Sequence, residues 1–478
     1  MVNSHASPLM VDFNKRAYRR LLLVVISLCV VGLLYSGYVA QDSLQFFLFT
    51  TAIFSMVVVL SPALLGRSFF PFEPITFVCF SVLMGLCLKT FYVILAFNTS
   101  IVVQDKLMVG LTIDDLAWST TVLLIGLVMC VLGYLIFDKN IVFSKKGNSS
   151  LSEPRLLFFS VVVIAVSLAA FIIFVAVSNF SFSDVRDLSQ KRFSPADGGR
   201  LSNINYYIYR VALFCKAPMY FLFFVIITRG RFRSIHGVLF ILALMLNIAA
   251  TFFVSNKAGV ILPFADLTVI YFILTGRLDL KKLVFFGGLV FVLVSIVAVF
   301  RSGDGALGLT LFDHLFGGRY FIGVTKSAQI INAFPQQIDF FYGKTLISWL
   351  NVFLPDSLST DDLYLTGLGK YLGFYVFGHT NSGVPPGIIT EIYINFGLAG
   401  VVIGMFLIGA VLKRAHIYLF SRVNSVFYLI VYALVTVRLP TFLFNNGMSV
   451  TILKCLADII IVWAFYILVK RISFTSYP

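Results

Sequence analysis

Apolar segments long enough to cross a lipid bilayer recur along almost the whole of this chain, and they constrain its fold more than any other feature. A transmembrane helix needs about 20 consecutive apolar residues, and it satisfies its own backbone hydrogen bonds where water is absent. Hydrophobic residues make up 59% of the 478 residues and charged residues only 12%, which excludes a soluble globular protein. The sequence therefore predicts an all-α polytopic membrane protein.

A window of about 19 residues places twelve such helices. They cover residues 21–40, 44–65, 74–97, 117–137, 156–178, 205–228, 237–255, 258–275, 283–300, 386–412, 423–443 and 448–469. The first segment follows Arg19-Arg20 without a small-residue cleavage site, so we interpret it as a span and not as a signal peptide. We expect one integral membrane domain over residues 1–478.

The charges between these segments predict their orientation. Lys and Arg gather before the first span, in every second loop after it and in the C-terminal tail, and such residues favour the cytoplasmic side. The net charge of +15 has the same explanation, so we infer no nucleic-acid partner. We expect both termini and the loops 138–155, 229–236 and 413–422 in the cytoplasm, with the loops 179–204 and 301–385 outside.

Motifs for nucleotides, metals and common hydrolases are missing from the sequence. It contains no GxxxxGK[ST], HExxH or GxSxG, and its six cysteines have neither disulfide nor zinc spacing. The first outside loop also lacks the paired Asp-x-Asp carboxylates of a metal-dependent transferase. We therefore expect chemistry without a metal or another cofactor.

The loop 301–385 is the longest polar interruption of the chain, and with the loop 179–204 it shares a Gly-Gly-Arg sequence that ends at Arg319 and Arg200. Glycines allow the backbone to approach a ligand closely, and arginine suits bidentate binding of phosphate. Coincidence between two short polar stretches is the alternative. Amphipathic aromatic segments such as 340–350 predict short helices at the membrane surface, above a cavity.

Cations gather at the expected outer face, where they suit an anionic head group such as the pyrophosphate of a lipid carrier. Fixed cations would stabilise that leaving group electrostatically, without a metal. The candidates are Arg200, Arg210, Lys257, Arg301 and Arg319. Arg210, Lys257 and Arg301 lie near span ends, where interfacial anchoring is an equally simple explanation.

Two groups near the re-entry of the large loop into the membrane are candidates for proton transfer. Glu391 lies inside an apolar helix, and an intramembrane carboxylate is a functional candidate. His379 precedes that helix, and a structural role in the loop is its alternative. A general base near the cavity would contribute about 10²–10⁴-fold to a rate.

The order of these features resembles the bacterial Wzy-type O-antigen polymerases and, more distantly, the O-antigen ligases. Residues 251–259 (Thr-Phe-Phe-Val-Ser-Asn-Lys-Ala-Gly) resemble the family's Ser-Arg-Gly turn, with Lys257 in place of arginine. Residues 318–335, followed by Gly343, resemble the Gly-Arg…Pro…Gly stretch of the large periplasmic loop. Residues 391–400 resemble the glutamate and Gly-Leu-x-Gly of the next helix.

Two departures from the family patterns matter. The ligases have a His-Asn pair shortly before that glutamate, where this chain has Pro386-Gly387, and this favours polymerase over ligase. The Arg-x10-Gly motif of some polymerases is also missing, so the roles of the arginines rest on their placement in the loops.

The resemblance implies a GT-C-type glycosyltransferase in the bacterial inner membrane. A growing glycan on undecaprenyl pyrophosphate would be the donor, and a single lipid-linked repeat unit would be the acceptor. A chain-length regulator is a further expected partner. The runner-up activities are an O-antigen ligase, which transfers the glycan to lipid A core, and a lipid-linked oligosaccharide flippase. A flippase is disfavoured by our expectation that the polar residues concentrate in one outside loop.

The resemblance and the loop placement together assign the site. The expected catalytic residues are Glu391, His379 and Arg319. Glu391 either accepts the proton or pairs with and orients an arginine, leaving proton transfer to His379 or to solvent. The residues expected to bind the pyrophosphate or the glycan are Arg200, Arg210, Lys257, Arg301, Arg319, Tyr393 and Asn395.

Overall fold

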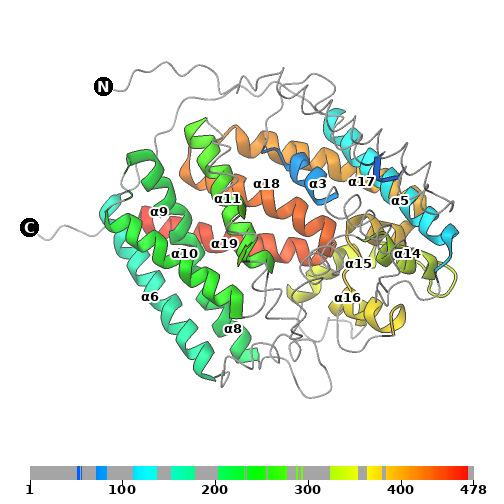
Figure 1. The fold of residues 1–478 in the computed structure, drawn as a ribbon, viewed down its shortest axis with the longest axis horizontal. Coiled ribbons are helices and arrows are strands. Elements are labelled where there is room, and N and C mark those ends of the chain that lie inside the picture. The colour runs from blue at the N-terminus through cyan, green and yellow to red at the C-terminus, as the bar shows by residue number, and fades with distance from the viewer. Residues whose placement is uncertain are drawn as a thin grey trace, which may run out of the picture.

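The helical architecture is seen in a computed structural model (Figure 1). It describes residues 51–53, 55, 72–82, 111–136, 152–177, 203–230, 232, 234–253, 257–276, 287–288, 292–293, 323–353, 363–378 and 384–471. The elements are α3 (Pro74–Val82), α5 (Ile113–Ile136), α6 (Glu153–Val177), α8 (Asn203–Ala212), η4 (Leu213–Cys215), α9 (Lys216–Arg229), α10 (Ile235–Phe253), α11 (Lys257–Thr275), α14 (Val324–Ala333), α15 (Lys344–Ile347), η6 (Ser348–Phe353), α16 (Leu363–Tyr375), α17 (Ile388–Phe420), α18 (Val426–Asn446) and α19 (Met448–Arg471). Every regular element in these ranges is a helix, which confirms the all-α prediction for this part of the chain.

Eight helices of the described part are long and apolar enough to cross a membrane. They are Asp114–Ile136, Glu153–Val177, Tyr207–Arg229, Ile235–Phe253, Ala258–Thr275, Ile388–Phe420, Val426–Asn446 and Met448–Lys470. Each overlaps one predicted span, so the chain is a multi-pass membrane protein. The expected span 74–97 is described only as α3, while 21–40 and most of 44–65 and 283–300 lie outside the described residues. The number twelve therefore stays a prediction.

The helices pack into two groups that share α18 (Figure 1). The first group joins α6, α9, α10, α11 and α19, and its core includes Phe221 against the ring of Phe465, with ring centroids 5.2 Å apart. The second group joins α3, α5, α14 and α17. The first half of α18 contributes to the first core, and Leu443 and Phe444 near its end contribute to the second.

Helices α5 and α17 approach each other through glycines. A Cβ atom on Gly133 would overlap the carbonyl oxygen of Phe406, and one on Gly409 would overlap the carbonyl oxygen of Cys130. Lipid tails are as apolar as the side chains, so helices in a membrane associate largely by such close packing. Larger residues at these two positions would force the two helices apart.

The cytoplasmic loop predicted at 413–422 is shorter than expected, because α17 continues to Phe420. Lys413 is consequently a helical residue that is only 5% exposed, with its Nζ 3.7 Å from Oε2 of Glu73 and 4.7 Å from the ring centre of Tyr134. The apolar window ended the span at this lysine. A neighbouring carboxylate and an aromatic ring allow the helix to continue past a charge.

The predicted short helices of the large loop are present as α14, α15, η6 and α16. Helix α14 is buried between α5 and α17, which the sequence did not indicate. The Lys326 ammonium donates to the carbonyl of Pro385 at 2.7 Å, and the Thr390 hydroxyl donates to the Ser327 hydroxyl at 3.1 Å. These bonds join α14 to the start of α17 and to the residues just before it.

The loop helices lie at one end of the second group. Trp118 near the start of α5 contacts Tyr393 near the start of α17, and the neighbouring Ser119 hydroxyl approaches the carbonyl of Val324 in α14 at 3.4 Å. Tyr134, near the other end of α5, lies beside Lys413. The described helices of the large loop and the buried Lys413 thus lie at opposite ends of α5.

Candidate functional site

The predicted site residues divide into those that the structure describes and those that it does not. Arg200, Arg301, Arg319 and His379 lie outside the described residues, and Lys257 is described only by its backbone, as the first residue of α11. The roles of these five residues stay predictions. Arg210, Glu391, Tyr393 and Asn395 can be followed in detail.

Glu391 lies in the first turn of α17 and is 1% exposed. Its Oε2 accepts a hydrogen bond of 2.6 Å from the backbone N–H of Met448, the first residue of α19, and the hydroxyl of Thr345 in α15 also donates to the carboxylate. The N-terminus of a helix presents unpaired N–H groups and a partial positive charge, so it stabilises a carboxylate. Glu391 therefore caps α19 and holds α15.

A glycine makes this cap possible. Gly447, between α18 and α19, has φ +91°, and a Cβ atom there would overlap Oε2 of Glu391. Residues with a side chain rarely adopt this conformation. The corner between α18 and α19 is thus shaped to admit the carboxylate.

Asn395 lies one turn after Glu391 and faces the same segment of the large loop. Its Nδ2 donates to Oγ1 of Thr345 at 2.7 Å and to the carbonyl of Glu391 at 2.6 Å, and its Oδ1 accepts from the N–H of Gly343 at 2.8 Å. We call Glu391, Asn395, Thr345, Gly343 and Met448 the loop anchor. It ties the large loop to two membrane helices through buried and half-buried hydrogen bonds.

Tyr393 does not join the loop anchor. Residues at i and i+4 share a face of a helix, whereas the residue between them points away. The Tyr393 hydroxyl instead lies 3.4 Å from Nε1 of Trp118 in α5, and its ring packs edge-on against Phe340. The structure therefore brings Glu391 and Asn395 together and separates Tyr393 from them.

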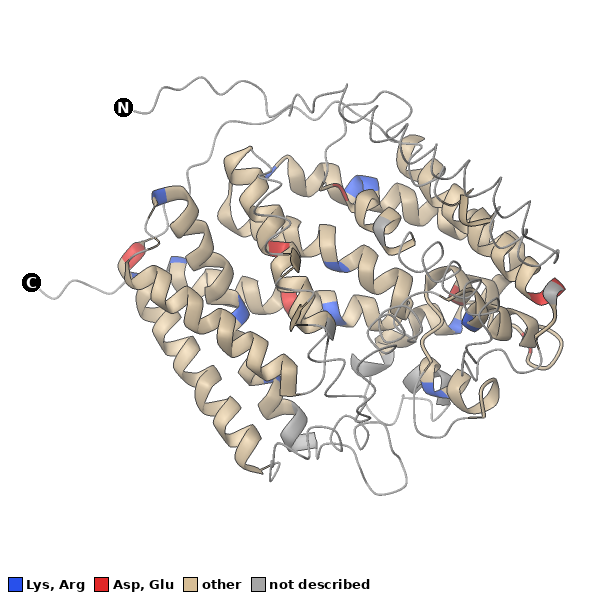
Figure 2. Ribbon diagram, in the orientation of Figure 1, with Lys and Arg blue, Asp and Glu red and all other residues tan. Residues whose placement is uncertain are grey.

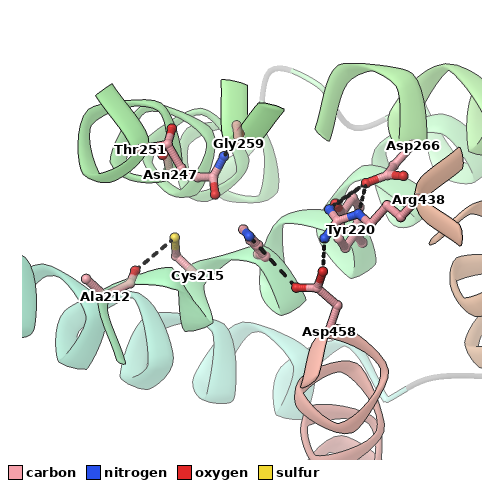
Figure 3. A network of polar contacts seen from close by, with 10 residues as sticks. Ala212, Cys215, Tyr220, Asn247, Thr251, Gly259, Asp266, Arg438 and Asp458 are labelled. Atoms are coloured by element: carbon pink, nitrogen blue, oxygen red, sulfur yellow. Dashed lines mark hydrogen bonds and ion pairs between the residues drawn. The ribbon is translucent and has the colours of Figure 1, made fainter. Parts of the chain in front are cut away.

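A second polar cluster, which the sequence analysis missed, lies inside the bundle (Figure 3). Arg438 in α18 donates through Nε and Nη2 to Oδ2 of Asp266 in α11, at 3.0 and 2.6 Å, and through Nη1 to Oδ2 of Asp458 in α19. Its Nη2 also donates to the Tyr220 hydroxyl of α9 at 2.6 Å, and that hydroxyl donates to Oδ2 of Asp266 at 2.6 Å. With Lys216 of α9, these residues form the Arg438 network.

The Arg438 network is deeply buried. Arg438 is 3% exposed and Asp266 0%, and both lie well inside apolar spans. Figure 2 shows charged residues on helices in the middle of the bundle as well as at its ends. Ionisable groups inside a bilayer cost several kcal/mol unless they are paired, and they mark functional positions more often than not.

Lys216 forms the looser edge of the network. Its Nζ is 3.8 Å from Oδ1 of Asp458, and the two side chains are 13% and 18% exposed. Arg210, one of the predicted binding residues, interacts electrostatically with both Lys216 and Asp458. The structure thus brings Arg210 to the edge of the Arg438 network.

The sequence did contain a signal for this network. Lys216, Asp266, Arg438 and Asp458 all fall inside predicted spans, and the rule that selected Glu391 applies equally to them. Only the pairing across four helices needed the structure, because no spacing along the chain predicts it.

A third cluster lies on the side of α5 and α17 away from the large loop. Oε2 of Glu73 accepts from the Tyr134 hydroxyl at 2.6 Å and lies 3.7 Å from Lys413, while its Oε1 is 3.8 Å from Nε2 of His416. The Tyr432 hydroxyl donates to the carbonyl of Phe72 at 3.0 Å. These contacts fix the start of α3 against the bundle.

Within the described ranges, no group of three or more His, Cys, Asp or Glu side chains could hold a metal ion. No protein-family model, curated protein or solved structure matches the chain. The functional argument therefore depends on the residues of this chain and on the contacts between them.

Proposed function

We propose that the protein is a polymerase that joins lipid-linked oligosaccharide repeat units on the periplasmic face of the bacterial inner membrane. The loop anchor is the observation that supports this most. Glu391 and Asn395, from the patch that resembles the O-antigen polymerases, bind the large loop to α17 and α19. An extramembrane loop fixed above membrane helices suits an enzyme whose donor and acceptor both arrive in the lipid.

In the proposed reaction, a hydroxyl of the acceptor sugar attacks the anomeric carbon of the donor glycan. The bond from that carbon to the pyrophosphate of undecaprenyl pyrophosphate breaks, and the hydroxyl proton is lost. Arg319, with Arg200 and Arg301, binds the leaving pyrophosphate. The fold is of the GT-C type with twelve spans, and both termini are cytoplasmic.

The contacts of Glu391 favour a positioning role for this residue. Its carboxylate accepts a hydrogen bond from Met448 and interacts with Thr345, so both contacts hold neighbouring segments of the protein together. We propose that Glu391 holds the large loop in place and that His379 or solvent accepts the proton. Glu391 as the general base is the alternative, and substitution by glutamine separates the two roles.

Transport of a lipid-linked oligosaccharide is the second candidate function, and the Arg438 network favours it. The sequence analysis disfavoured transport because polar residues were expected in one outside loop. That expectation is wrong for the described spans, in which Asp266, Arg438 and Asp458 are buried. Intramembrane ion pairs are common in substrate and proton pathways.

Deletion of the gene and inspection of the surface polysaccharide would distinguish the candidates. Loss of a polymerase leaves lipopolysaccharide with a single repeat unit, loss of a flippase leaves none, and loss of a ligase leaves long lipid-linked polymer unattached. We expect the first result. Long attached chains in the deletion strain would refute all three activities.

Complementation with Arg319→Ala would then test the proposed site. A lost charged hydrogen bond to a buried phosphate costs about 2–4 kcal/mol, or roughly 30- to 1000-fold in rate. Arg319→Lys should restore polymer only in part, because an ammonium cannot reproduce the bidentate guanidinium. The matched control is Arg422→Met, since Arg422 stacks on Tyr418 away from the loop. Normal chain lengths with Arg319→Ala at normal protein level would exclude this role.

A further inference from the structure

We infer that Lys216, at the edge of the Arg438 network, binds the phosphate group of a lipid head group inside the membrane bundle. The inference deepens the proposed function by adding a binding residue for the lipid pyrophosphate, and it rests on that function for the identity of the lipid. Lys216 is neither in the segments that resemble the polymerases nor among the candidate cations that the sequence analysis placed at the outer face.

The first argument is that Arg438 already binds both carboxylates of its network, so Asp458 has a partner other than Lys216. Asp458 already accepts a hydrogen bond from Nη1 of Arg438, and Arg438 is bound by Asp266 as well. The distance of 3.8 Å from Nζ of Lys216 to Oδ1 of Asp458 is too long for a hydrogen bond. Within the described part of the chain, none of the three N–H donors of Lys216 makes one.

The second argument is the direction in which Lys216 points. Helix α9 runs parallel to α19, because Lys216 lies beside Asp458 and Phe221 packs on Phe465 further along both helices. The N-terminal side of α9 therefore points to the end of α19 at which the loop anchor lies. Side chains of a helix lean toward its N-terminus, so the Lys216 ammonium leans toward that end.

The short 3₁₀ segment η4 places Arg210 on the same side. An α-helix turns by about 100° per residue and a 3₁₀ helix by about 120°. The residues of η4, Leu213–Cys215, lie between Arg210 and Lys216, so the two cations face within about 60° of each other. Both cations also interact electrostatically with Asp458, which agrees with this placement.

The third argument concerns the chemistry of the ligand. An ammonium group inside a span needs acceptors for its protons, and the oxygens of a phosphate are strong, charged acceptors. Lys216 lies nine residues, or about 14 Å, beyond Tyr207, where the span begins. A phosphate on a lipid reaches that depth more easily than a free anion, because its hydrocarbon tail remains in the bilayer.

Binding to the purified full-length protein tests the inference without any assay of activity. The protein is placed in phosphatidylcholine nanodiscs, undecaprenyl pyrophosphate is added as the lipid probe, and bound lipid is measured by native mass spectrometry. Inorganic pyrophosphate is titrated in parallel. We expect Lys216→Met to weaken binding about 10- to 100-fold, as the loss of a charged hydrogen bond requires. Lys216→Arg should retain most of the affinity.

Two further variants separate ligand binding from a structural ion pair. Asp458→Asn removes the negative charge beside Lys216 and keeps an acceptor for Arg438, so binding should stay equal or become tighter. Lys470→Met, at the far end of α19, is the matched control and should bind as the native protein does. Lys216→Gln replaces Lys216→Met if the methionine variant does not fold.

Each outcome decides the inference. Weaker binding of either probe in Lys216→Met alone supports it, and the probe that responds shows whether the pyrophosphate suffices or the lipid tail is needed. Unchanged binding of both probes, or the same loss in Lys216→Met and Asp458→Asn, overturns it. An equal loss of affinity in Lys470→Met also overturns it, because the loss would then follow from the removal of any positive charge and not from the position of Lys216. The gene deletion is read independently, so failure of the polymerase proposal would be recognised separately.

Discussion

Removal of the Arg438 guanidinium should be among the most destabilising single changes in the described spans. The substitution Arg438→Met keeps a long flexible side chain but leaves Asp266 without its cation and Asp458 with only the Lys216 ammonium, 3.8 Å away. Arg438 makes four hydrogen bonds, to Asp266, Tyr220 and Asp458. Breaking a buried ion pair from one side costs about 3–5 kcal/mol, because the remaining charge is uncompensated.

Comparison with smaller effects makes this magnitude informative. A neutral hydrogen bond between membrane helices contributes on average only about 0.6 kcal/mol, so four average neutral bonds would contribute about 2.4 kcal/mol. A loss of about 3–5 kcal/mol would therefore reflect the buried carboxylates left without Arg438 more than the lost hydrogen bonds. Adding Asp266→Asn and Asp458→Asn to Arg438→Met should recover most of the loss, because Lys216, at the more exposed edge of the network, is then its only remaining charge.

The free energy of unfolding would be measured in bicelles by steric trapping. The matched control is Arg422→Met, because Arg422 is exposed and stacks on Tyr418, with its guanidinium 3.7 Å from the ring centre. We expect a change below about 1 kcal/mol for this control. A loss below about 1 kcal/mol in Arg438→Met, or a triple variant no more stable than Arg438→Met alone, would refute the reasoning.

Three further outcomes are expected. Purified Glu391→Gln should still elongate a lipid-linked repeat unit, because an amide oxygen can accept the hydrogen bond from Met448. Glu391→Ala should lose the contacts that hold the large loop, and with them most activity. A loss of about 10²-fold in the glutamine variant would instead support Glu391 as the general base. Gly447→Ala should lower the unfolding free energy by about 1–3 kcal/mol, and an unchanged melting temperature would contradict the geometry of the cap. An impermeant thiol reagent should label a cysteine at Ser359 but not at Ser149 in intact spheroplasts, and the reverse pattern would invert the topology.

The spans were predictable because apolar length is a local property of the sequence. Their ends were less so. The window stopped the tenth span before Lys413, and the contacts of that lysine with Glu73 and Tyr134 explain why the helix continues. Burial of α14 was likewise hidden, because the partners of Lys326 and Ser327 lie about 60 residues away in the chain.

The sequence also predicted part of the candidate site, and again only the part that depends on local spacing. The spacing of Glu391 and Asn395 places both on one face of a helix, and the structure has them on one face. Their partners, Thr345 and Met448, come from segments that no local pattern connects to this helix. The pairing of Arg438 with Asp266 depends in the same way on helices that are 172 residues apart in sequence.

The break in α17 at Gly397 sets the limits of what can be exchanged between related chains. Its backbone is non-helical there, with φ 64° and ψ −160°, so residues 388–396 form a short separate helix before the long one. The polar contacts of that short helix are made largely with residues 327–345 of the large loop. A chimera that exchanges only residues 301–385 would separate the large loop from the short helix that binds it. A chimera with its boundary at Gly397 would transfer the loop and the short helix 388–396 together.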